Sequence, residues 1–246
     1  MSGIDYGAAP VPVREDLPAA HRRAWRRLAR PGSWWSGSER VAIAAEVRNA
    51  PSCPLCRERK AALSPGAVAG RHAALGGLPD AALDAVHRIT TDPGRLTTAW
   101  FEETLAAGLG DGRYVELVGV VVTVVSIDSF CRGLGVPLHP LPEPEPGEPS
   151  RRRPPGLASG VAWVPMLERR RAAPEDRDIF PAPRDANVLR ALSLVPDEVR
   201  TLLDLSGAHY LKPRQMLDLA RSDRALDRAQ IELVAARVSA LRECFY

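Results

Sequence analysis

The sequence predicts an all-α fold, a bundle of helices. Apolar residues recur at helical spacing in several segments, and no segment shows the strand–turn–strand pattern of a β-hairpin. Prolines lie between the periodic segments, where they stop one helix or start the next. With 246 residues, of which 45% are hydrophobic, the chain can supply ordinary cores for two domains of common size.

Composition divides the chain into four parts. We expect a flexible N-terminus at 1–18, a helical domain at 19–138, a linker at 139–157 and a second helical domain at 158–246. The linker is predicted from the run PLHPLPEPEPGEPSRRRPPG, because closely spaced prolines keep a chain extended. The second region reaches the last residue without a pattern that would close a domain, so we expect it to be incomplete.

The first helices are marked by their end signals. A helix is expected to start at Ser38 and to stop at Pro51. Proline suits the first position of a helix, so Pro54 predicts a new one, with Cys53 at its N-cap and Cys56 in its first turn.

The valine-rich segment 114–134 is the hardest to assign. Valine favours strands, but the length of the segment and its lack of proline predict a buried helix. We expect Cys131 in this helix to be buried, and its acidic residues Glu116 and Asp128 to be solvated near helix ends. Further helices are predicted over 79–89, 97–107, 197–206, 213–220 and 227–241.

Charge and motifs exclude several partners. The net charge of +3 is small beside 33 basic and 30 acidic residues, so we expect no nucleic-acid partner. The apolar run 117–127 is shorter than the roughly 20 residues of a membrane-spanning helix, and the chain does not start with a secretory pattern. We therefore expect a cytoplasmic protein that does not enter the membrane. No nucleotide, haem or flavin motif occurs, so we expect no cofactor.

Two of the four cysteines form the motif Cys53-Pro-Leu-Cys56. Four cysteines are too few for a secreted disulfide scaffold, and in a reducing compartment this spacing suggests redox or metal chemistry. A zinc site could add His72 or His87, but their spacing matches no usual zinc motif, so we expect no metal. An inert structural pair is the other alternative.

A second cysteine signal lies near the end of the chain. Glu232 lies on a predicted helix, and Cys244 follows it twelve residues later. This spacing, together with the earlier segment ERVAIAAEVRNAPSCPLCRERKAAL, resembles the alkylhydroperoxidase D / carboxymuconolactone decarboxylase-like superfamily of helical thiol redox proteins. The resemblance implies two tandem copies, of which the second stops at the first cysteine of its Cys-x-x-Cys pair. In the first copy Val41 and Lys60 occupy the family's glutamate and histidine positions.

The resemblance implies a thiol-dependent peroxidase or disulfide oxidoreductase. Its catalytic residues would be Cys53, Cys56, Glu232 and Cys244. Its partners would be a small peroxide or disulfide, a thiol reductant and further copies of the chain in a homo-oligomer. The alternatives are a decarboxylase acting on a lactone acid and a non-catalytic helical scaffold. The stop after Tyr246 suggests a fragment, a nonsense mutation or a UGA codon for selenocysteine.

The residues themselves support thiol chemistry. The unpaired N–H groups and the dipole at a helix N-terminus stabilise a thiolate, and we expect Arg57 and Arg59 to add positive charge nearby. Such a thiolate can attack a peroxide oxygen or a disulfide sulfur, and the cysteine three positions away can then form a disulfide with it. In the first copy Glu39 or Glu46 could replace the missing glutamate.

Overall fold

The computed structural model describes residues 4–182, 186–216, 218, 220, 224–241 and 244. Helices dominate it, which confirms the all-α prediction. The α-helices are α1 (Asp16–Ala29), α2 (Gly37–Asn49), α3 (Pro54–Ala61), α4 (Asp80–Thr91), α5 (Thr98–Ala106), α6 (Asp111–Leu134), α7 (Asn187–Arg190), α8 (Pro196–His209), α9 (Pro213–Met216) and α10 (Arg228–Leu241). The shorter elements are the strands β1 (Leu157–Ala158) and β2 (Met166–Leu167) and the 3₁₀ turns η1 (Ala50–Ser52), η2 (Pro65–Ala67), η3 (Pro93–Arg95), η4 (Arg169–Arg171) and η5 (Pro174–Ile179).

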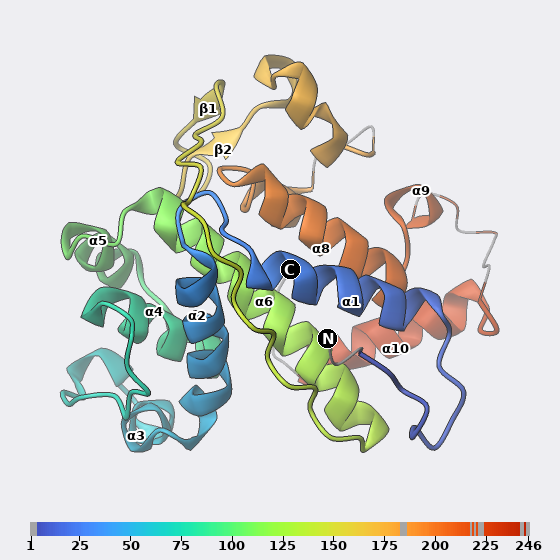
Figure 1. The fold of residues 1–246 in the computed structure, drawn as a ribbon, viewed down its shortest axis with the longest axis horizontal. Helices are drawn as coiled ribbons and strands as arrows, with labels where there is room; N and C mark the ends of the chain where they lie inside the picture. The colour runs from blue at the N-terminus through green and yellow to red at the C-terminus, as the bar shows by residue number, and fades with distance from the viewer. Residues whose placement is uncertain are drawn as a thin grey trace.

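Helix α6 is the central element of the bundle. It packs against α2 and α4 on one side and α8 on the other, and α1 packs on α8 and α2 (Figure 1). The valine-rich segment is therefore a helix, as predicted, and Gly135 ends it in the left-handed conformation with φ 69°. Within the described part of the chain, α6 alone is long and apolar enough to cross a membrane, but 67% of its apolar window is buried inside the protein.

Local signals in the sequence place the helices around α6. Helix α2 starts one residue before the predicted Ser38, because Ser36 and Glu39 form a capping box. Helix α3 starts at Pro54 with Cys53 as its N-cap, as predicted. The start of α3 therefore places the Cys-x-x-Cys motif at the N-terminus of a helix.

Helix α8 shares the hydrophobic core of the first region. Val199 and Leu205 of α8 belong to the same cluster of buried residues as Leu28 of α1 and Leu117 of α6. The second region also contains the antiparallel pair β1–β2. The part of the chain expected to form a second domain thus supplies a helix that completes the bundle around α6.

The N-terminus, expected to be flexible, and the Pro-rich segment, expected to be an extended linker, are both in contact with this bundle. Ile4 and Tyr6 of the N-terminus are buried in the core, and the hydroxyl of Tyr6 lies 2.6 Å from Nδ1 of His21. The Pro-rich segment 139–157, here named the strap, runs beside the junction of α1 and α2. Its backbone N–H groups donate hydrogen bonds to carbonyls of the junction: Glu145 to Ala29 (2.7 Å), Ser150 to Gly32 (3.1 Å) and Arg151 to Ser33 (2.8 Å).

The prediction that Glu116 and Asp128 are solvated is wrong. Their exposed fractions are 0% and 2%, because each faces an arginine of α2. Asp128 accepts two hydrogen bonds from Arg48, at 2.8 and 2.9 Å. Glu116 accepts one from Arg40 at 2.5 Å, and the same guanidinium nitrogen donates to Glu198 of α8 at 2.8 Å. These ion pairs tie α2 and α8 to α6.

Helices α9 and α10 lie at the periphery of the molecule (Figure 1). Helix α9 ends at Met216, and the remainder of the helix predicted over 213–220 falls partly outside the described residues. Helix α10 forms where it was predicted, but none of its side chains is buried, and four of its large apolar side chains are exposed. The exposed fractions are 71% for Leu233, 56% for Val234, 54% for Val238 and 63% for Leu241.

Candidate functional site

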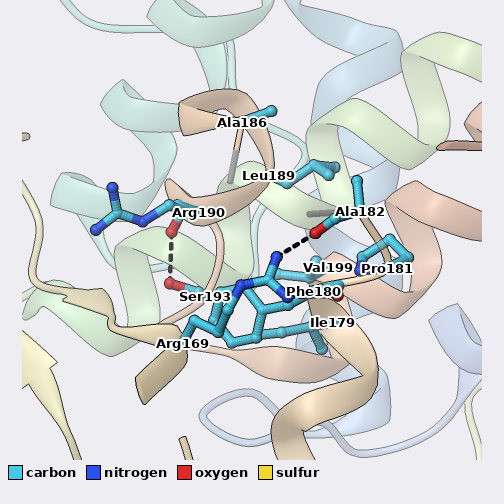
Figure 2. A pocket seen from close by; sticks show the side chains of 10 residues that line it. All are labelled: Arg169, Ile179, Phe180, Pro181, Ala182, Ala186, Leu189, Arg190, Ser193 and Val199. Atoms are coloured by element: carbon cyan, nitrogen blue, oxygen red, sulfur yellow. Dashed lines mark hydrogen bonds between the residues drawn. The ribbon is translucent and has the colours of Figure 1, made fainter. Parts of the chain in front are cut away.

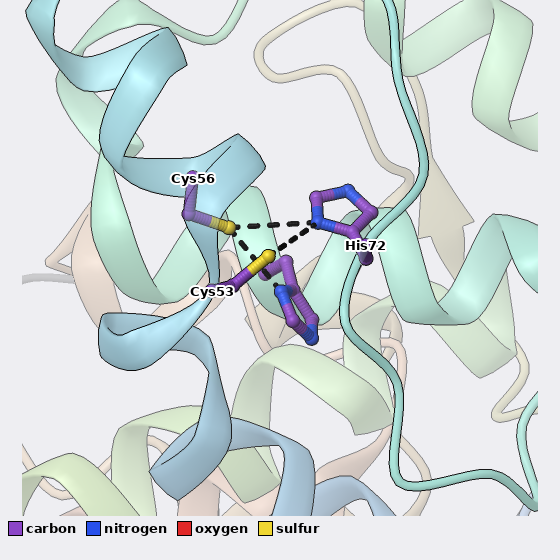
Figure 3. A group of neighbouring side chains, drawn as sticks. Cys53, Cys56 and His72 are labelled. Atoms are coloured by element: carbon purple, nitrogen blue, oxygen red, sulfur yellow. Dashed lines mark hydrogen bonds between the residues drawn. The ribbon is translucent and has the colours of Figure 1, made fainter.

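Two cysteines and two histidines converge beside α3. Cys53 precedes this helix, Cys56 lies in its first turn, His72 lies in the loop between α3 and α4, and His87 lies on α4. The four ligand atoms, two Sγ and two imidazole nitrogens, all lie within 4.8 Å of one another. Figure 3 shows both sulfurs and the His72 ring facing the same space.

The sulfur–nitrogen contacts are short. Nδ1 of His72 lies 3.6 Å from Sγ of Cys53 and 3.5 Å from Sγ of Cys56. Nδ1 of His87 lies 3.2 Å from Sγ of Cys56. Cys53 also accepts a hydrogen bond from the backbone N–H of Ala73 at 3.4 Å, so the loop is held against the start of α3.

A carboxylate orients each imidazole from its far side. Nε2 of His72 lies 3.0 Å from Asp84, and Nε2 of His87 lies 3.1 Å from Glu46. Nε2–H therefore donates to the carboxylate, which leaves the lone pair of Nδ1 directed at the sulfurs when the ring is neutral. Asp84 is itself held by the indole N–H of Trp100 at 2.8 Å.

These contacts shift the pKa values of the site. Burial alone would raise the pKa of the Cys56 thiol, but hydrogen bonds with His72 and His87 outweigh it and lower this pKa to about 6. Burial would lower the pKa of His72, but the hydrogen bonds to Asp84 and to the two thiols raise it to about 10. The pKa of His87 is raised too, because Cys56 and Glu46 outweigh its burial. The site favours thiolate and imidazolium over thiol and imidazole.

The predicted roles of the arginines are met in part. Arg59 donates to Asp84 at 2.8 Å and lies 3.2 Å from Nε2 of His72, so its positive charge reaches the site through these two residues. Arg57 is exposed on the next turn of α3. Arginine therefore positions the histidines and carboxylates of the site rather than the sulfurs themselves.

A small cavity lies beside Cys56. Its volume is about 20 Å³, and its walls include Arg59, Arg88 and Arg95 together with Thr91. A space of this size holds about one water-sized molecule. The cavity therefore gives a very small polar molecule a place against Cys56.

A second cavity, between η5 and α8, has a structural explanation. Its volume is about 10 Å³, too small for a substrate. The guanidinium of Arg169 lies over the ring of Phe180, 5.1 Å from its centroid, and donates to the carbonyl of the same residue at 3.1 Å. Figure 2 shows these side chains packed together with Ile179 and Val199.

The two other expected catalytic residues lie elsewhere. Glu232 is on α10, which Figure 1 places on the opposite side of the bundle from α3. Its carboxylate accepts hydrogen bonds from the hydroxyl of Tyr210 at 2.5 Å and from Arg228 at 2.6 Å. Cys244 is exposed beyond the end of α10. The structure thus brings Cys53 and Cys56 together and leaves Glu232 and Cys244 apart from them.

Sequence reasoning missed most of the groups around the cysteines. It named Glu46 as a possible replacement for the missing glutamate, and Glu46 does reach the site through His87. It considered His72 and His87 only as zinc ligands and set them aside on their spacing. Asp84 and His87 lie three residues apart on one face of α4, which is a signal for a polar site on this helix, whereas no local pattern marks His72 in the loop.

The chain was compared with protein-family models, curated proteins and solved structures, and none of them matches it.

Proposed function

We propose that Cys53 and Cys56 form a redox-active dithiol that reduces a small peroxide or disulfide with electrons from a thiol reductant. The observation that carries this proposal is the buried line from Glu46 through His87 to Cys56. Its two links measure 3.1 Å and 3.2 Å. A carboxylate, an imidazole and a thiol in this order can remove the thiol proton and return it to a leaving group.

The reaction with a peroxide has two steps. His87 accepts the proton of Cys56, and the thiolate attacks a peroxide oxygen and breaks the O–O bond. Cys56 becomes a sulfenic acid, and the leaving oxygen takes the proton from His87 as an alcohol, or as water when the substrate is hydrogen peroxide. The Cys53 thiol then attacks the Cys56 sulfur, which forms the disulfide and releases water. Two electrons have left the sulfurs, and the thiol reductant restores them.

The size of the cavity supports hydrogen peroxide as the oxidant. About 20 Å³ beside Cys56 accommodates a molecule close to water in size, whereas an aromatic hydroperoxide needs the surrounding arginine side chains to move. A reducing compartment such as the cytoplasm supplies the thiol reductant. We also propose that the chain is a distant relative of the superfamily it resembles and forms a homo-oligomer as its members do.

The test follows the disulfide directly. Metal-free, reduced protein is treated with hydrogen peroxide, and the disulfide between Cys53 and Cys56 is measured by mass spectrometry. We expect it to form in the wild type and in C131A, and C53S to accumulate a sulfenic acid on Cys56. H87N should slow the reaction about 100-fold, the scale of a lost general base.

Two results would contradict the proposal. One is the absence of a disulfide in metal-free wild-type protein that is folded by circular dichroism. The other is an equal rate for H87N and the wild type, since the geometry would then contribute nothing to the chemistry. A faster reaction with cumene hydroperoxide than with hydrogen peroxide would refute the proposal that hydrogen peroxide is the preferred oxidant.

A further inference from the structure

We infer that Cys53, Cys56, His72 and His87 form a tetrahedral binding site for Zn²⁺. Two thiolates and two imidazoles are a donor set that zinc prefers. The sequence argued against this site because the two histidines follow Cys56 by 16 and 31 residues, outside the usual zinc motifs. The fold removes that objection, because the loop after α3 and the helix α4 bring them to the sulfurs.

The spacing of the donor atoms fits the ion. Zn–S bonds of about 2.3 Å and Zn–N bonds of about 2.05 Å in a tetrahedron place sulfur and nitrogen roughly 3.5 Å apart. The three measured sulfur–nitrogen distances are 3.2, 3.5 and 3.6 Å. Three of the six donor–donor distances therefore lie close to the value that a bound ion needs, and all four donor atoms lie within 4.8 Å of one another.

The groups behind the ligands fit as well. A histidine that binds a metal usually donates its other ring N–H to a carboxylate, which fixes the ring and makes the free nitrogen more basic. His72 has Asp84 and His87 has Glu46 in this position. The backbone N–H of Ala73 donates to the Cys53 sulfur, as is suitable for a thiolate that carries charge in a buried place.

The local packing explains what the ion would do. Cys53, Leu55 and Cys56 form a small buried cluster, with Val68 packed against it, that is separate from the main core. So few apolar contacts are weak support for a short helix and the loop after it. Bound zinc would join α3, the loop and α4 by four bonds, and its two charges would balance the two thiolates. The protons held by the thiols and imidazoles would pass to solvent on binding.

The inference goes beyond the redox proposal and uses the same side chains. Zinc-bound thiolates are held apart by the metal, so the loaded protein should resist formation of the Cys53–Cys56 disulfide. Zinc occupancy would then decide whether the dithiol is available, and metal-free protein is the form in which the dithiol is tested.

The experiment measures metal binding by the full chain. Protein stripped of metal by a chelator under reducing conditions is titrated with Co²⁺ and then with Zn²⁺. We expect one Co²⁺ per chain, with the intense visible absorption of tetrahedral cobalt and a thiolate charge-transfer band, and complete displacement by one equivalent of Zn²⁺. C56S and H87N should lose the thiolate–tetrahedral spectrum, and C131A should keep it.

A variant of a residue that holds a ligand separates loss of metal binding from misfolding. D84N removes the carboxylate behind His72 without touching a ligand, and we expect it to weaken Zn²⁺ binding about 10- to 100-fold while the protein stays folded. Weak octahedral cobalt absorption in folded wild-type protein would overturn the inference, and so would a full tetrahedral spectrum in C56S. If zinc binds but the metal-free protein forms no disulfide, the zinc site is supported and the redox proposal fails. If the disulfide forms but zinc does not bind, the redox proposal is supported and the zinc site fails.

Discussion

Glu198 is a buried carboxylate with an unusual neighbourhood. One of its oxygens accepts from Arg40, whereas Oε2 has no hydrogen-bond partner within the described part of the chain. Glu116 faces the same guanidinium, and both of its oxygens accept hydrogen bonds, from Arg40 and from the backbone N–H of Trp34. One positive charge thus faces two carboxylates. Burial and the charge of Glu198 raise the pKa of Glu116, Arg40 and the N–H of Trp34 lower it, and the net result is a pKa of about 7.

The shared charge predicts a pH dependence of stability. The folded pKa of Glu116, about 7, exceeds its ordinary value of 4.5, so the protonated form stabilises the fold. This contribution is complete below pH 4.5 and is lost as the pH rises through 7. E198Q removes the competing charge and keeps the hydrogen bond from Arg40. We expect the free energy of unfolding of E198Q to fall less over this range than that of the wild type, because burial is then the main remaining cause of the raised pKa.

Urea unfolding at a series of pH values measures this difference. The exposed Glu143 provides a matched control, because E143Q removes one negative charge from the strap and none from the ion-pair cluster. E143Q should follow the wild-type profile. If the free energy of unfolding changes with pH in the same way in the wild type and in E198Q, Glu198 does not raise the pKa of Glu116.

Single residues were predictable where their partners are near in sequence. Cys53 and Cys56 form a contiguous motif, and Pro54 fixes the helix that presents them. The charges inside α6 were placed wrongly because their arginine partners lie on α2, 76 and 80 residues away. A sequence pattern shows that Glu116 is charged and that its neighbours are apolar, but only the packing of two helices shows what neutralises it.

At the scale of elements, α6 and α8 approach closely at Gly119. A Cβ atom at this position would lie 2.6 Å from Cγ and 2.7 Å from Cβ of Glu198, closer than real atoms come. The Glu198 side chain cannot move away without losing Arg40. We therefore expect G119A to destabilise the protein by about 1 to 3 kcal/mol, the usual effect of overpacking.

Gly133 in the same helix is the control for this substitution. A Cβ atom there meets nothing within 4 Å, so G133A should stabilise the helix by about 0.5 to 1 kcal/mol. Thermal unfolding followed by circular dichroism measures both variants. Equal effects of the two substitutions would mean that helix propensity alone decides them and that the contact between α6 and α8 is looser than described.

Elements with strong end signals were predicted to within a few residues. The capping box at Ser36 and the glycine after α6 are local chemistry, and they decide the boundaries without tertiary contacts. The strap was expected to be an extended linker because of its prolines, and the N-terminus was expected to be flexible. Backbone hydrogen bonds, such as that from Ser150 to Gly32, hold the strap, and the contact between Tyr6 and His21 holds the N-terminus. Contacts of this kind leave no trace in composition.

For the whole molecule, a shared core predicts a single unfolding transition. Leu28 of the first region and Leu205 of the second lie in the same cluster, with exposed fractions of 1% and 2%. We expect L28A and L205A each to destabilise the protein by about 2 to 5 kcal/mol and to move one calorimetric peak to lower temperature. L63A, at a fully exposed position, should leave the peak in place. Two peaks, of which each variant moves a different one, would mean that the regions are separate domains.

The strap also has a consequence for synthesis on the ribosome. Ala29, Gly32 and Ser33 receive their hydrogen bonds from residues 145–151, which are translated more than a hundred positions later. The carbonyls at the junction between α1 and α2 therefore lack these partners while the five helices α2 to α6 are synthesised. Contacts of such long range form late and slowly. The nascent chain thus passes through a stage in which its helices exist and the strap that joins them has yet to be made.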